Sequence, residues 1–287
     1  MTPKGRYAYR RSVKSATSDE LINTYLLRPA AGVLVRLLYR TRVTPNHLTI
    51  GSIATGLVAA LLYGQASAQT TIIAGLLVTV KDILDGADGQ LARSRHQYSR
   101  AGRFLDSIGD IVVNASLFGA FTGVLYSQTG EASFLVLGVL AFLGTTLRVS
   151  YHVYYQTAFL HLQGGYSLNR MTEELREEDL RAGRGTILLQ RIFQTLYGWQ
   201  DRMISRLDSW SRHARPLTGH LRTIWFADPT ALRLSSFLGL GTELSLLTVS
   251  SLFVRLDLYL YLNLFLMNGI WAACVAYRRW GLSRRVV

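Results

Sequence analysis

The sequence has one cysteine and few acidic residues, and each scarcity excludes a class of protein. Cys274 alone cannot build an intrachain disulfide framework, and its apolar neighbours predict a small buried side chain. The chain has 18 acidic residues against 31 lysines and arginines, which gives a formal net charge of +13. Such a charge suits either nucleic acid or an anionic membrane surface. Because no nucleic-acid-binding motif is present and long apolar segments are, we expect a lipid bilayer as partner and no nucleic acid.

These apolar segments predict an all-α integral membrane protein with about six transmembrane helices. The expected spans are residues 47–64, 70–95, 103–126, 134–155, 232–253 and 257–277. Basic residues gather at both termini, in the 93–100 loop and in an insert at about 160–230. The positive-inside rule therefore predicts both termini and this loop on the cytoplasmic side, in a multi-pass protein of the cytoplasmic membrane. The basic N-terminus is not followed by an apolar core with a cleavage site, so we expect no signal peptide.

Two units are expected along the chain. Residues 1–43 form a cytoplasmic tail and a basic amphipathic helix, in which Pro29 should break or kink the helix. This helix lies flat on the membrane or packs as an ordinary helix. Residues 44–287 form the six-helix transmembrane unit with its cytoplasmic insert. Within the insert, apolar residues at spacings of three and four between 188 and 210 predict an amphipathic helix, either a surface helix or a lid or dimer contact.

The densest polar pattern lies between residues 81 and 110. Its spacing is Asp85-x2-Asp88-Gly89-x2-Ala92-Arg93-x8-Gly102-x3-Asp106-x3-Asp110. Residues three or four apart share a helix face, so two adjoining helices would bring the four aspartates into one pocket at the membrane edge. Crowded carboxylates need a counter-charge, and an all-oxygen ligand set favours Mg2+ or Mn2+ over zinc. Ionisable residues in membrane segments are costly, so a merely solvated acidic helix pair explains the pattern poorly.

The other residues of the pattern suit a phosphate ligand. Gly89 and Gly102 leave the backbone open to a bulky group, and Arg93 offers a planar fork of donors to phosphate oxygens. A pyrophosphate held on the metal would explain all three residues. His96 lies in the connecting loop, where we expect a solvated side chain rather than a catalytic one.

The pattern resembles the signature of the CDP-alcohol phosphotransferase (CDP-alcohol phosphatidyltransferase) family, D-x2-D-G-x2-A-R-x8-G-x3-D-x3-D, at every fixed position. The resemblance implies that an alcohol hydroxyl attacks the β-phosphorus of a CDP-alcohol and that CMP leaves, with two Mg2+ or Mn2+ ions or one tightly held ion. It implies metal ligation by Asp85, Asp88, Asp106 and Asp110, with Asp110 also acting as general base. Gly89, Arg93 and Gly102 would hold CDP.

Two further positions have candidate roles. Thr44 and Pro45 form a helix-start signal, and the run TPNHLT resembles the opening of the family's first span, which would place Asn46 and Thr49 near the nucleotide. The capping role alone explains Thr44 and Pro45. Arg148 lies in the fourth span, at the depth where the family binds the phosphate of the acceptor. Snorkelling, or a salt bridge to Glu243, is the alternative.

The resemblance implies CDP-diacylglycerol as donor, a small alcohol or phospho-alcohol such as inositol phosphate, glycerol phosphate or serine as acceptor, a role in phospholipid synthesis, and a possible homodimer. A soluble donor such as CDP-inositol, yielding a polyol phosphodiester, is the alternative. A divalent-cation transporter would use the same carboxylates but leaves Arg93 and the two glycines unexplained. A purely structural membrane protein gains nothing from four carboxylates at this depth. The insert departs from the family's shorter connection, which leaves the acceptor open.

Overall fold

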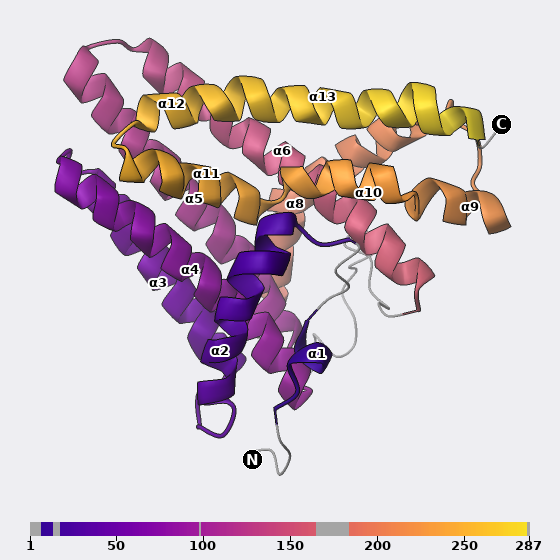
Figure 1. Ribbon diagram of the computed structural model, residues 1–287, viewed down its shortest axis with the longest axis horizontal. Coiled ribbons are helices and arrows are strands. Elements are labelled where there is room, and N and C mark those ends of the chain that lie inside the picture. The colour runs from indigo at the N-terminus through magenta and orange to yellow at the C-terminus, as the bar shows by residue number, and fades with distance from the viewer. Residues whose placement is uncertain (1–6, 14–17, 98, 165–183, 286–287) are drawn as a thin grey trace.

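The computed structural model describes residues 7–13, 18–97, 99–164 and 184–285, and within these ranges every regular element is a helix (Figure 1). The first half contains α1 (Tyr9–Ser12), η1 (Asn23–Leu27), α2 (Arg28–Leu38), α3 (Pro45–Tyr63), α4 (Ala68–Arg95), α5 (Arg100–Thr129) and α6 (Ser133–Leu162). The second half contains α8 (Arg184–Ser211), α9 (Gly219–Phe226), α10 (Pro229–Ser235), η3 (Ser236–Leu238), α11 (Leu240–Leu252), α12 (Leu256–Tyr261), η4 (Leu262–Met267), α13 (Asn268–Ala276), η5 (Tyr277–Leu282) and η6 (Ser283–Arg285). Part of the expected insert, residues 165–183, lies outside the described residues.

The all-α membrane class is confirmed. Four described helical runs are long and apolar enough to cross a membrane, namely α3, α5, α6 and the continuous run Leu256–Leu282. The polar second half of α4 keeps that helix out of the set, and the stretch 229–252 is divided into shorter helices. The count of six spans therefore stays a prediction.

Close approaches at glycines hold α3 and α5 together. A Cβ atom on Gly56 of α3 would lie 2.4 Å from Val113 of α5, and one on Gly109 of α5 would lie 2.3 Å from Ile53 of α3. Small residues allow such packing where lipid removes the hydrophobic drive between helices. The apolar core beside them includes Tyr63, Val78, Phe118, Phe121, Leu247 and Tyr259. This bundle fixes the adjoining ends of α4 and α5, which carry the acidic pattern.

The helix before the bundle has two apolar faces. Ala31 and Val35 of α2 are buried among residues that include Ala87 and Leu91 of α4, while Val33, on the opposite face, is 63% exposed. The outer face also carries Tyr25, Leu26 and Leu37. An exposed apolar stripe fits a helix at a membrane surface. Pro29 does not end the helix: the helical run continues from residue 21 to residue 38, and its backbone forms the π turn η1 directly before Arg28 and Pro29.

The expected fifth span, residues 232–253, is interrupted. Gly239 is extended between η3 and α11, and the carboxylate of Glu20 fills the break. Oε2 of Glu20 accepts hydrogen bonds from the backbone nitrogen of Thr242 at 2.8 Å and from its hydroxyl at 3.2 Å. A Cβ atom on Gly239 would lie 2.0 Å from Cδ of Glu20. The segment before α2 thus caps the start of α11.

The amphipathic helix of the insert is confirmed as α8, and its apolar stripe is divided: Leu196, Met203 and Leu207 are partly buried against apolar clusters, whereas other members face outward. Leu188, Trp199 and Trp210 of that stripe are 60%, 41% and 51% exposed. The packed face is partly polar. It includes Phe193, whose ring centroid lies 5.2 Å from that of Phe104 of α5, as well as Tyr197, Gln200 and Asp208. The outward stripe suits contact with lipid, which an apolar pattern alone cannot distinguish from contact with a protein core.

Candidate active site

Three aspartates meet where the end of α4 adjoins the start of α5. One carboxylate oxygen each from Asp85, Asp88 and Asp106 lies within 4.8 Å of the others. Oxygens that share one octahedral Mg2+ at about 2.1 Å lie about 3 to 4 Å apart, so this cluster needs only a small closure around an ion. The all-carboxylate donor set suits Mg2+ or Mn2+.

A hydroxyl from α3 orients one of these carboxylates. Oγ1 of Thr49 donates to Oδ2 of Asp88 at 2.5 Å, and both side chains are buried. Thr49 lies just inside α3, which Thr44 caps by accepting the backbone N–H of His47. The expected helix start is confirmed, and it brings Thr49 to the cluster.

The fourth aspartate is held by a lysine. Nζ of Lys81 lies 2.5 Å from Oδ1 of Asp110, 3.6 Å from Asp82 and 3.9 Å from Asp85. Lys81 is 1% exposed, so its buried ammonium group depends on these carboxylates, of which Asp82 is buried and Asp85 and Asp110 are partly exposed. The structure therefore brings three of the four expected ligands together and places Asp110 in an ion pair. Asp110 as metal ligand and general base stays a prediction.

Lys81 is the residue that the sequence reasoning missed. The signal was available, because a lysine inside an apolar segment needs a partner and Lys81 stands four residues before Asp85 on the same helix face.

The remaining motif residues form two close pairs. A Cβ atom on Gly102 would lie 2.6 Å from Oδ1 of Asn46, which places the first turn of α5 against the first turn of α3. A Cβ atom on Gly89 would lie 3.2 Å from Nη1 of Arg93, so the guanidinium lies across the bare backbone of its own helix. Both glycines thus let a polar side chain approach the helix backbone closely, Asn46 at Gly102 and Arg93 at Gly89.

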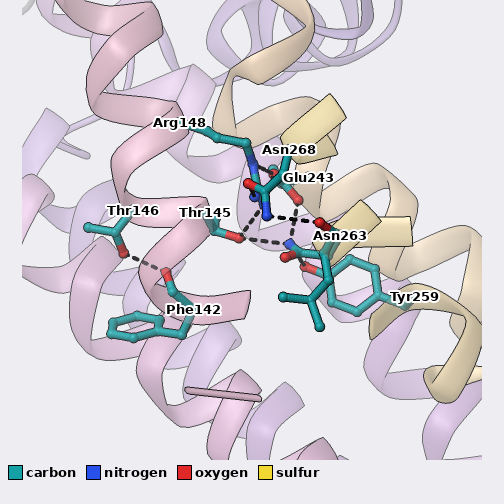
Figure 2. A network of polar contacts seen from close by, with 9 residues as sticks. Phe142, Thr145, Thr146, Arg148, Glu243, Tyr259, Asn263 and Asn268 are labelled. Carbon is teal, nitrogen blue, oxygen red and sulfur yellow. Dashed lines mark hydrogen bonds and ion pairs between the residues drawn. The ribbon is translucent and has the colours of Figure 1, made fainter. Parts of the chain in front are cut away.

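Arg148 lies in a buried network away from the motif sequence (Figure 2). Its Nη2 is 2.5 Å from Oε1 of Glu243, its Nη1 donates to Oδ1 of Asn268 at 2.6 Å, and both charged side chains are 0% exposed. Asn263 donates to the other oxygen of Glu243 at 2.8 Å and to Thr145 at 2.7 Å. The salt bridge to Glu243 is confirmed. The acceptor role of Arg148 stays a prediction.

Two smaller expectations agree with the structure. His96 is exposed and ends α4 with a left-handed backbone, as a solvated loop residue can. Cys274 is buried, at 3% exposure.

The fold and the carboxylate cluster together define a helical membrane protein with a candidate site for a divalent metal where two helices meet. Residues 42–163 match the family model described as CDP-alcohol phosphatidyltransferase, a range that contains α3 to α6 and every motif residue. Residues 42–163 therefore form a domain of this family.

Each of the following relatives matches only part of the chain. A bifunctional IPC transferase and DIPP synthase of Thermococcus kodakarensis is 33% identical over 147 residues, which is 51% of this chain and 32% of the relative. An archaetidylinositol phosphate synthase of Pyrococcus horikoshii is 40% identical over 97 residues, which is 33% of this chain and 48% of the relative. An uncharacterized protein of Aquifex aeolicus is 32% identical over 157 residues, or 54% of this chain and 74% of the relative. The chain thus spans about a third of the first relative's length.

Proposed function

We propose that this protein transfers a phospho-alcohol group from a CDP-alcohol to the hydroxyl of a small polar acceptor and releases CMP. The carboxylate cluster of Asp85, Asp88 and Asp106, within 4.8 Å, is the observation that carries the proposal. These side chains would hold Mg2+ or Mn2+, and a bound ion would neutralise the pyrophosphate and the departing CMP. Thr49 fixes one carboxylate before any ligand arrives, which reduces the cost of ordering the site.

The acceptor needs a base, and Asp110 is our candidate. As the acceptor oxygen bonds to the β-phosphorus, the bond from that phosphorus to CMP breaks and the hydroxyl proton passes to the Asp110 carboxylate. Lys81, 2.5 Å away, fixes the orientation of this carboxylate. A carboxylate is a weak base toward an alcohol, so correct positioning must supply much of the rate.

The nucleotide would lie along the two glycines. Gly89 and Gly102 let the donor approach α4 and α5, Arg93 would contact its phosphates and Asn46 its nucleotide. The side chain of Asn46 lies directly against Gly102, and this proximity supports a shared role for the two residues.

We place CDP-diacylglycerol first as donor, with CDP-inositol as the soluble alternative. The similarity to an archaetidylinositol phosphate synthase of Pyrococcus horikoshii puts inositol phosphate first among the acceptors. We also propose that residues 44–287 are the catalytic unit, that residues 1–43 lie at the membrane surface, and that both termini and the site are cytoplasmic. A homodimer remains part of this proposal.

An acceptor screen tests the function directly. The full chain in lipid nanodiscs, with Mg2+ or Mn2+, should release CMP from CDP-diacylglycerol only when an acceptor is present, and mass spectrometry should identify the phospholipid product. CMP release from CDP-inositol but not from CDP-diacylglycerol would select the soluble-donor alternative. No turnover of any CDP-alcohol, together with Mn2+ flux into vesicles, would contradict the proposal and indicate a transporter.

Filling the space at Gly102 should weaken donor binding. Gly102→Val is expected to raise the Kd of CDP in the presence of Mg2+ by about tenfold, because the new side chain would displace Asn46. Titration calorimetry measures this effect. Gly119→Val is the matched control, since a Cβ atom on this other glycine of α5 has nothing within 4 Å. Equal CDP affinity in both variants would remove Gly102 from the donor site.

A further inference from the structure

The segment before α2 lies against the part of α4 that carries the motif. We call Tyr7–Ser12, which includes α1, the N-terminal strap. The ring of Tyr9 lies where Gly32 of α2 has no side chain, since a Cβ atom there would be 2.6 Å from Cε2 of the ring. Ser12, at the end of the strap, is 0% exposed. The strap therefore packs against both α2 and α4.

A buried glutamine next to the motif glycine anchors the strap. Oε1 of Gln90 accepts from the hydroxyl of Tyr7 at 3.3 Å and lies 3.4 Å from the hydroxyl of Ser12. The same amide donates through Nε2 to the backbone oxygen of Arg28 at 2.9 Å. Gln90 is 0% exposed, so these polar groups depend on one another for hydrogen bonds.

The anchored strap contacts Arg93. Nε of Arg93 donates to the backbone oxygen of Ser12 at 2.5 Å. The far end of the same guanidinium lies across Gly89, where a Cβ atom would be 3.2 Å from Nη1. A planar guanidinium that is held at Nε has its orientation fixed, and its fork is useful to a phosphate only in the correct plane.

We propose that Ser12 and Gln90 are positioning residues that hold Arg93 ready for the pyrophosphate of the donor. This inference rests on the proposed function, because it needs Arg93 to bind the donor phosphates. The strap precedes residues 42–163, so it lies outside the part of the chain that matches the family model. Fixing a long side chain before binding reduces the entropy that the ligand must offset, so the benefit should appear in donor affinity rather than in the chemical step.

The test measures CDP binding to the full chain in Mg2+ by titration calorimetry. Gln90→Met keeps the side-chain volume but removes the anchor, and we expect the Kd of CDP to rise about fivefold. The kcat for CMP release should stay within about twofold while the KM for the donor rises. Tyr7→Phe removes a single hydroxyl at a half-buried position and should change the Kd in the same direction, by less. Ser94→Ala is the control on α4, because its hydroxyl donates to the backbone oxygen of Gln90 within the same helix.

A double-mutant cycle identifies the route of the effect. Arg93→Lys keeps the positive charge but removes the Nε donor. Adding Gln90→Met to Arg93→Lys should therefore raise the Kd of CDP by less than about twofold. Equal costs in both backgrounds, or unchanged CDP affinity in Gln90→Met, would overturn the positioning role alone. Absence of CDP binding by the native chain would overturn the proposed function and this inference with it.

Discussion

Asp110→Asn is expected to slow CMP release by about 10³-fold while the Kd of CDP stays within about twofold. Asparagine has nearly the same shape and can still accept the hydrogen bond from Lys81, which lies 2.5 Å from Asp110. It cannot accept the proton of the attacking hydroxyl. The loss should therefore fall on kcat, measured as CMP formed at saturating donor and acceptor.

The control for this experiment is Asp257→Asn, an aspartate that pairs with Arg255 on the turn before α12. This variant should turn over at the native rate. Native turnover by Asp110→Asn would remove Asp110 from the mechanism. A large loss of CDP affinity would instead show that Asp110 acts mainly as a metal ligand.

Arg148→Ala is expected to destabilise the fold by about 3–5 kcal/mol, because it leaves the Glu243 carboxylate buried without its partner. Both side chains are 0% exposed, and the arginine links α6 to α11 and to the start of α13. Thermal unfolding in detergent or nanodiscs, followed by loss of monodisperse protein, measures the effect.

A second variant separates charge from packing in this network. Changing both residues together, Arg148→Met with Glu243→Met, removes the unpaired charge and should recover much of the lost stability. Arg255→Ala, which breaks an exposed pair at the turn before α12, should change stability little. Equal stability of Arg148→Ala and the native chain would show that the network in Figure 2 does not hold these helices together.

The motif could be predicted from the sequence because helix geometry determines which of its residues share a face. Asp85 and Asp88 lie three apart, and the structure brings both to Asp106 on the next helix. The same geometry places Lys81 on the face of Asp85, but the spacing does not show that its nearest partner is Asp110 on the next helix.

Contacts between distant parts of the chain were beyond the reach of sequence patterns. The break at Gly239 depends on Glu20, more than 200 residues away, and no local signal links the two. The strap reaches Arg93 through a backbone oxygen, which carries no sequence signature. The apolar stripe of α8 could not show which of its residues pack on protein, because lipid and protein core both accept apolar side chains; the buried polar residues Gln200 and Asp208 mark the packed face.

The central claim is that carboxylates from α4 and α5 jointly bind a divalent metal beneath a cytidine diphosphate. The most direct measurement is anomalous diffraction at the manganese edge from crystals of the full chain grown with CDP and Mn2+. The account predicts a manganese peak within about 2.5 Å of oxygens of Asp85, Asp88 and Asp106, with the CDP phosphates on its open side. Carboxylates that point apart, or CDP bound with no manganese at this cluster, would contradict it.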